Sequence, residues 1–172
     1  MPTLVLVFLL CALSCRNEQY GLNGTSPGRS DFRGHSSVSS IVDSIVISLR
    51  VPSTSRIGHP IHFELIARNP THRALPFNLA NPNPAFFIVT DASGTVVWSS
   101  VPGEPAIDLM EVNMSLKPGG ERKLSGNWTQ STKGGLQSKS GDYFVTGILI
   151  GDFTTPEIRI GPLHFRIASP RV

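Results

Sequence analysis

The side chains best suited to chemistry in this sequence include His59 and His62, which stand three residues apart. Such a pair is a candidate metal ligand set. An odd spacing on a β-strand sends the two rings to opposite faces, so regular strand geometry does not let them chelate one ion. Pairing of His62 with His164 stays open as an alternative, because a neutral imidazole is a common ligand. Because strand geometry separates the two neighbouring histidines, we predict no metal site and no cofactor.

A second candidate is Ser26, which lies in the stretch Gly24-Thr-Ser26-Pro-Gly28 and formally matches the G-x-S-x-G motif of serine hydrolases. That motif needs a buried strand before the serine and a helix after it, whereas Pro27 follows here in a polar tract. We expect four acids at ordinary solvent-exposed or turn positions: Glu64, Asp91, Glu104 and Asp108. No serine, histidine and acid arrangement is indicated, and we predict that the protein is not an enzyme.

Length and composition favour one domain built from turns and strands. The 172 residues suit one ordinary domain with additional sequence. The 16 glycines and 14 prolines are typical of a chain that turns often and has few long helices. The net charge is +3, but the 15 lysines and arginines are scattered, so we predict no nucleic-acid partner.

The first fifteen residues resemble an export leader. The ten-residue apolar run Leu4–Leu13 is about half the roughly 20 residues that a membrane-spanning helix needs. It is followed by Ser14-Cys15, as at a bacterial lipoprotein processing site, where acylation of the cysteine would hold the protein at a membrane surface. Ala12 and Ser14 also satisfy the rule for ordinary secretory cleavage, so a secreted or periplasmic protein is the alternative, and an uncleaved apolar start is a third.

Residues 1–15 are therefore the predicted leader and Cys15 the predicted lipidation site of an exported cell-envelope protein. Residues 16–40 are polar, rich in Gly, Ser and Pro, and show no periodicity, which predicts a flexible linker. The folded domain is predicted over 41–169. Its only candidate cysteines, Cys11 and Cys15, precede it, so we expect no disulfide there.

Alternation of apolar and polar residues predicts short strands separated by turns. Asp91-Ala-Ser-Gly94 indicates a hairpin, and Lys117-Pro-Gly-Gly120 is typical of a type II turn. The predicted strands cover 41–51, 61–67, 75–79, 86–90, 95–99, 107–116, 124–128, 143–150 and 158–167. The predicted fold is an all-β, antiparallel, Ig-like β-sandwich of about seven to nine strands.

Two tryptophans and one tyrosine recur after the turns. Trp98 and Trp128 alternate with other apolar residues, so we predict core positions, the alternative being exposed anchors for a partner. Tyr143 closely follows Gly141 and is predicted to pin a loop through its hydroxyl, as tyrosine corners do.

The segment from about Phe63 to Leu149 resembles the intracellular proteinase inhibitor family, the BsuPI domain. The resemblance rests on Phe63-Glu-Leu65, Asn69, Leu75-Pro-Phe77, Phe87-Ile-Val-Thr-Asp91, Gly94, Val97-Trp98, Leu116, Pro118-Gly119-Gly120-Glu121, Trp128, Gly141-Asp-Tyr143, Val145 and Gly147. It implies an Ig-like sandwich and inhibition of a subtilisin-type serine protease. The family's namesake works inside the cell, whereas the leader of this chain directs it outside.

Two loops are long enough to insert into a protease. Ser99–Pro105 is stiffened by two prolines, whereas Gln130–Ser140 contains Gly134-Gly135 and is expected to be flexible. The first is the candidate inhibitory loop, with Val101, Pro102, Gly103 and Glu104 at its centre. The alternative functions are an Ig-like interaction or structural module of the cell envelope and, third, a carbohydrate-binding sandwich with aromatic side chains aligned on one exposed face.

Overall fold

The computed structural model describes residues 34–79, 84–100, 114–151 and 157–169, which form strands and turns only. The predicted leader with Cys15 lies outside these residues. The described strands are β1 (His35–Val42), β2 (Ile45–Pro52), β3 (Thr54–Arg56), β4 (Ile61–Arg68), β5 (Leu75–Pro76), β6 (Ala85–Asp91), β7 (Val96–Ser99), β8 (Ser115–Leu116), β9 (Glu121–Trp128), β10 (Gly141–Leu149) and β11 (Ile158–Ala168).

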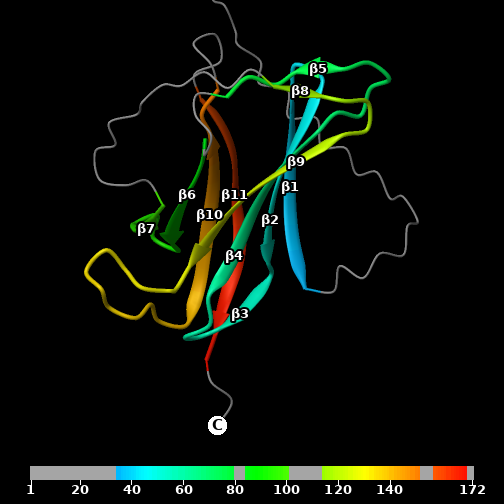
Figure 1. The fold of residues 1–172 in the computed structure, drawn as a ribbon. Helices are drawn as coiled ribbons and strands as arrows, with labels where there is room; N and C mark the ends of the chain where they lie inside the picture. Colours follow the sequence, from blue (N-terminus) through cyan, green and yellow to red (C-terminus); the bar gives the residue numbers. More distant parts are fainter. Residues whose placement is uncertain (1–33, 80–83, 101–113, 152–156, 170–172) are drawn as a thin grey trace, which may run out of the picture. The chain divides into compact units, whose positions relative to one another are not determined.

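Two sheets pack face to face in this part of the chain (Figure 1). The first has the strand order β1-β2-β4-β9 and the second β3-β11-β10-β6-β7, while β5 and β8 form a separate two-stranded ribbon. Neighbouring strands are antiparallel except for β3, which runs parallel to β11.

The strand order is that of an immunoglobulin-like sandwich, as predicted. Strands β2, β4 and β9 take the places of strands A, B and E, and β11, β10, β6 and β7 take those of G, F, C and C′. Strand β1 is an addition at the edge of the first sheet. The Greek-key connections of this order bring loops that are distant in sequence to the same end of the sandwich.

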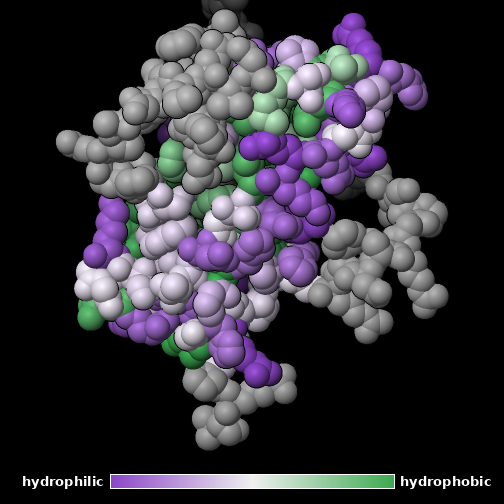
Figure 2. Space-filling model, in the orientation of Figure 1, coloured by the Kyte–Doolittle hydropathy of each residue, from purple (hydrophilic) through white to green (hydrophobic). Residues whose placement is uncertain are grey.

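The core lies between the two sheets because inward-facing positions on the strands are apolar. On β2, for example, buried and half-buried side chains alternate strictly. Aromatic rings join the layers: Phe63 of β4 lies 5.5 Å from Phe87 of β6 and 6.0 Å from Phe165 of β11, measured between ring centroids. Outward-facing positions on β4 and β9 are mostly polar, and the face in Figure 2 is largely hydrophilic there.

The start of the domain differs from the prediction. Instead of one strand over 41–51, the chain forms a hairpin of β1 and β2, with Asp43 and Ser44 as its two-residue turn. Both turn residues have positive φ, 48° and 68°, as a type I′ turn requires. Residues 35–40, which we placed in the linker, belong to β1. The serine-rich composition concealed this strand because residues 35–40 contain a single apolar side chain, Val38.

The turn at Lys117–Gly120 has the predicted type II geometry. The Gly120 N–H donates to the Lys117 carbonyl oxygen over 2.8 Å, and Gly119 has a φ of +69°. The buried Asn69 holds this turn from the end of β4, since its side-chain amide donates to the Leu116 carbonyl oxygen over 2.8 Å. The strand predicted over 107–116 is described only from residue 114, where β8 covers Ser115–Leu116.

Candidate functional site

Asp91 serves the hairpin between β6 and β7. Its Oδ1 atom accepts hydrogen bonds from the Ser93 N–H (2.9 Å), the Ser93 hydroxyl (2.6 Å) and the Thr95 N–H (3.0 Å). The Ser93 hydroxyl, together with the backbone N–H groups of Thr95 and Ser93, lowers the pKa of Asp91, while burial opposes the shift. Gly94 completes the turn with a φ of +84°. These contacts show that Asp91-Ala-Ser-Gly94 has a structural role in the hairpin turn.

The two tryptophans stack on each other, with ring centroids 6.1 Å apart and an interplanar angle of 28°. Trp128 is fully buried, and its Nε1–H donates to the Ser131 carbonyl oxygen over 2.9 Å. Trp98 is half-buried and packs against the core. The core prediction is confirmed for Trp128, whereas Trp98 is only partly buried. Only one of the two rings can therefore touch a sugar, which argues against an aligned aromatic platform.

Tyr143 lies at the start of β10 beside these tryptophans. Its hydroxyl donates to the Lys139 carbonyl oxygen over 2.8 Å, so the predicted pinning of the loop is confirmed. Burial raises the pKa of Tyr143, and the negative charge of Asp91, its register partner on β6, raises it further. Gly141, with a φ of +157°, turns the chain into β10. The residues described above, from the Asp91 turn through the two tryptophans to Tyr143, thus have structural roles in the sandwich.

Gln130 is a key residue that the sequence analysis missed. Its buried side-chain amide donates to the carbonyl oxygens of Arg56 (2.8 Å) and His59 (2.6 Å), and its Oε1 atom accepts from the Gly58 N–H (2.9 Å). It therefore ties the loop after β9 to the turn after β3. The glycine pair in this loop led us to expect flexibility, but the loop is held by these bonds and by the bridge between Ser131 and Gln137. A single glutamine in a loop gives no sequence signal for such a contact.

His62 and His164, which we considered as a ligand pair, lie on different sheets and have different polar neighbours. The His62 Nδ1 atom is 2.9 Å from the Asn127 Oδ1 atom on the outer face of the first sheet. The His164 Nε2 atom is 3.0 Å from the Asp142 Oδ1 atom on the outer face of the second sheet. His62 and His164 are thus on opposite sides of the core and do not pair. Within the described ranges, no group of three or more His, Cys, Asp and Glu side chains is placed to hold a metal ion.

One end of the sandwich gathers several connections, and we call it the loop end. Leu149, the last residue of β10, pairs with both Ala85 and Ile158, the first residues of β6 and β11. The chain therefore enters β6, leaves β10 and enters β11 at neighbouring positions. In antibody variable domains the same end of the sandwich carries the binding loops.

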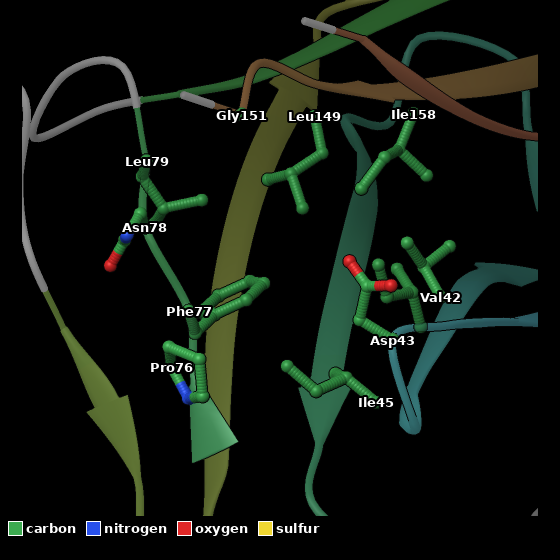
Figure 3. Close-up of a pocket in the computed structure, with 11 residues that line it drawn as sticks. Val42, Asp43, Ile45, Pro76, Phe77, Asn78, Leu79, Leu149, Gly151 and Ile158 are labelled. Atoms are coloured by element: carbon green, nitrogen blue, oxygen red, sulfur yellow. The ribbon is translucent and has the colours of Figure 1, made fainter. Parts of the chain in front are cut away.

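A cavity of about 320 Å³ opens at the loop end (Figure 3). Phe77 and Leu79 lie on one side of it, and Val42, Asp43 and Ile45 from the β1–β2 turn lie on the other. Most of its lining residues are apolar, although polar atoms form about as much of the exposed wall as apolar atoms do, and the lining is completed by Ile47, Pro76, Asn78, Leu149, Gly151 and Ile158. The Asp43 carboxylate is the charged group among these lining residues. A cavity of this size, with a wall of both polar and apolar atoms, has room for one side chain of a partner protein.

The candidate inhibitory loop starts near this end, but Val101, Pro102, Gly103 and Glu104 lie outside the described residues. The residue before them, Ser100, is firmly bound to β6. Its N–H donates to the Phe87 carbonyl oxygen (2.9 Å), and its hydroxyl accepts from the Phe87 N–H (2.8 Å). The chain resumes at Met114, whose carbonyl oxygen accepts from the Phe77 N–H in the wall of the cavity (2.8 Å). Both attachment points of the segment 101–113 are thus well anchored.

Fold and site together define an Ig-like β-sandwich with a cavity at its loop end. No protein-family model matches the chain, and no curated protein matches it. None of the described residues forms a helix long and apolar enough to cross a membrane.

Among solved structures, the chain is similar to a β-glucosidase from Listeria innocua in complex with gluconolactone (10% identity, TM-score 0.39) and to one from Erythrobacter marinus (9% identity, TM-score 0.40). Each match covers 78% of this chain and 16% of the glucosidase, so the chain spans about a sixth of those proteins. A CARDB domain from Pyrococcus furiosus in complex with di-metal ions matches 83% of this chain and 95% of its own length, at 12% identity and a TM-score of 0.36. These values are too low to assign a family or an activity.

Proposed function

We propose that this protein is an exported, non-enzymatic binding module that engages a protein partner through its loop end. The cavity between Phe77 and Asp43 is the observation that carries the proposal, because it is a depression lined mostly by apolar residues at the end where Ig-like domains present their loops. The partner implied by the resemblance to the BsuPI domain is a serine protease of the subtilisin type. If the predicted leader exports the chain, that partner is outside the cytoplasm.

The cavity supports such binding by its chemistry. Insertion of an apolar side chain into a desolvated pocket is a typical source of binding energy in protein interfaces. The walls come from β2, from the segment after β5 and from the ends of β10 and β11, so they are held by both sheets. Rigid walls reduce the entropy lost on binding. The segment 101–113, which continues from Ser100 and ends at Met114, is the proposed inhibitory element.

The test is inhibition of purified subtilisin by the full chain at micromolar concentration, followed with a peptide substrate. We expect slower hydrolysis and a loss of this effect of at least tenfold in the variant Ile158→Trp, in which the indole fills the cavity. Leu136→Trp is the matched control, since Leu136 is 72% exposed in the loop at the opposite end of the sandwich. Inhibition that survives Ile158→Trp but is lost on replacing Val101–Glu104 by glycine and serine would assign binding to the loop alone.

An Ig-like interaction module of the cell envelope is the second candidate, and the edge of β1, which has no partner strand among the described residues, favours it. If micromolar chain slows no subtilisin-type protease, this candidate replaces the inhibitor proposal. Affinity capture from an envelope extract then separates the two further: a bound protease supports inhibition, and an assembly protein or polysaccharide supports the module.

A further inference from the structure

The outer edges of the two sheets are protected very unequally. Among the described residues, four strands lie at edges: β1 and β9 in the first sheet, and β3 and β7 in the second. An edge strand presents unpaired N–H and C=O groups that invite pairing with another chain. Natural proteins block this by short strands, charged side chains, prolines, bulges or inward-pointing charges.

Three of the four edges carry such protection. β3 has three residues and β7 has four, and the register between β6 and β7 is shifted by an irregularity. β9 is long but carries Glu121 and Lys123 on its outer face. Its Arg122 lies on the same face as Leu124 and Trp128, with its Nε atom buried and without a hydrogen-bond partner. An inward-pointing charge of this kind discourages the addition of a further strand.

Strand β1 has none of these features. It is eight residues long and contains only His, Ser, Val and Ile, with no acid, lysine, arginine, proline or glycine. Its register with β2 runs without a bulge from His35 to Val42. At its exposed end Ile41 is 65% accessible, the second most exposed large apolar side chain among the described residues. By comparison with the other edges, β1 carries the least protection against pairing.

The backbone groups that face outward can be identified. The Ser53 N–H donates to the Gly34 carbonyl oxygen over 2.7 Å, so Gly34 and Ser53 form a hydrogen-bonded pair that continues the β1–β2 register. Hydrogen-bonded and non-bonded pairs alternate in antiparallel strands. The even-numbered residues of β1 therefore bond to β2. His35, Ser37, Ser39 and Ile41 direct their N–H and C=O groups to the free edge.

We infer that β1 pairs with β1 of a second copy of this chain, antiparallel and about a two-fold axis through Val38. In this register Ser37 faces Ser39 of the other copy and His35 faces Ile41, so all four outward residues are hydrogen-bonded. Val38 faces Val38 on the side of the core, where it already packs against the buried cluster. No like charges meet, and serine pairs and β-branched pairs are favourable across strands. The second copy is the favoured occupant because the same uncharged strand satisfies both sides of the pairing.

The pairing joins two four-stranded sheets into one continuous sheet and is independent of any protease target. The first test is sedimentation equilibrium of the full chain between about 1 and 100 µM, a range that detects dimers of micromolar affinity. We expect twice the monomer mass at the upper end. The variant Ser37→Lys/Ser39→Lys brings lysines of the two copies face to face and should shift the dissociation constant at least tenfold. Ser125→Lys on β9 is the matched control, because it places the same residue on the other edge of the same sheet.

Two further measurements keep the test independent of folding defects. Val38→Cys, in a chain with Cys11→Ser and Cys15→Ser, should form an intermolecular disulfide on oxidation, because non-bonded antiparallel pairs have Cα atoms about 4.5 Å apart. Ser40→Cys in the same background should not, since its two copies lie on the order of 13 Å apart along the strands. Hydrogen exchange at Ser37, Ser39 and Ile41 should slow with protein concentration.

A chain that stays monomeric at 100 µM overturns the proposal. So does a dimer that the lysine variant leaves unchanged, or in which Ser40→Cys crosslinks as readily as Val38→Cys. Slow exchange of the Ser37 and Ser39 amides in a monomer at every concentration also overturns it, because the edge is then covered by something other than a second copy.

Discussion

The hydroxyl of Tyr143 donates a hydrogen bond to the carbonyl oxygen of Lys139, four residues earlier in the chain, over 2.8 Å. The bond closes the long loop between β9 and β10 at the point where the chain enters the second sheet. The ring packs against Trp128 and Phe165, with centroids 5.7 and 5.9 Å away. One side chain thus fixes a loop by its polar end and the core by its apolar body.

The variant Tyr143→Phe isolates the polar end of this contact. The ring keeps its packing, but the Lys139 carbonyl loses its donor, so we expect the free energy of unfolding to fall by about 1 kcal/mol. Urea unfolding followed by tryptophan fluorescence measures this, since Trp128 lies beside the ring. An unchanged midpoint with an unchanged slope would contradict the role given to the hydroxyl.

The same variant tests the pKa of Tyr143. Because burial and the charge of Asp91 raise this pKa, the native state keeps the phenolic proton to higher pH than the unfolded chain does. The contribution is complete below the unfolded pKa of about 10 and is lost as the pH rises through the folded pKa. The stability advantage of the natural protein over Tyr143→Phe should therefore shrink above pH 10. An advantage that grows there contradicts the direction of the shift.

Gln130 should be more important than its place in a loop suggests. Gln130→Ala leaves the Gly58 N–H and the carbonyl oxygens of Arg56 and His59 without their partner, and we expect a loss of about 3 kcal/mol in unfolding free energy. Gln130→Glu keeps the shape but faces two carbonyl oxygens with a carboxylate. Its stability relative to the natural protein should rise as the pH falls and the carboxyl is protonated. Thermal unfolding between pH 3 and 8 checks both variants.

Gly126 on β9 allows close packing of the two sheets. A Cβ atom there would lie 2.6 Å from the Phe87 Cδ2 atom, and the Phe87 ring is itself stacked on Phe63 in the core. We expect Gly126→Ala to lower the free energy of unfolding by about 1–3 kcal/mol through overpacking. Gly134→Ala is the matched control, since its Cβ atom meets nothing closer than 3.9 Å. Equal effects of the two substitutions would contradict the role given to packing against Phe87.

Cys15 decides the predicted mode of anchoring. If the leader is processed as in lipoproteins, the natural chain incorporates radioactive palmitate and Cys15→Ala does not. Mass spectrometry of the mature N-terminus distinguishes an acylated Cys15 from ordinary secretory cleavage. Labelling that persists in Cys15→Ala would exclude this residue as the lipid attachment site.

The sequence alone predicted the features that depend on neighbouring residues. Period-two alternation marked the long strands β4, β9 and β11, and the residues of the Asp91 and Pro118 turns specified their geometry because φ preferences are local. It also placed Trp128 in the core and predicted the role of the Tyr143 hydroxyl. The sequence analysis missed residues 35–40 of β1, because five of these six residues are His or Ser and show no apolar alternation.

Only the tertiary structure decided which distant segments meet. The Gln130 amide reaches carbonyl oxygens more than 70 residues away in sequence, and the cavity at the loop end joins the β1–β2 turn to residues after β5 and at the ends of β10 and β11. Which edge of which sheet is left without protection likewise follows from strand order. Such contacts depend on how the strands assemble, so local propensity does not encode them. The proposed partner site at the cavity and the proposed dimer at the edge of β1 both depend on this assembly.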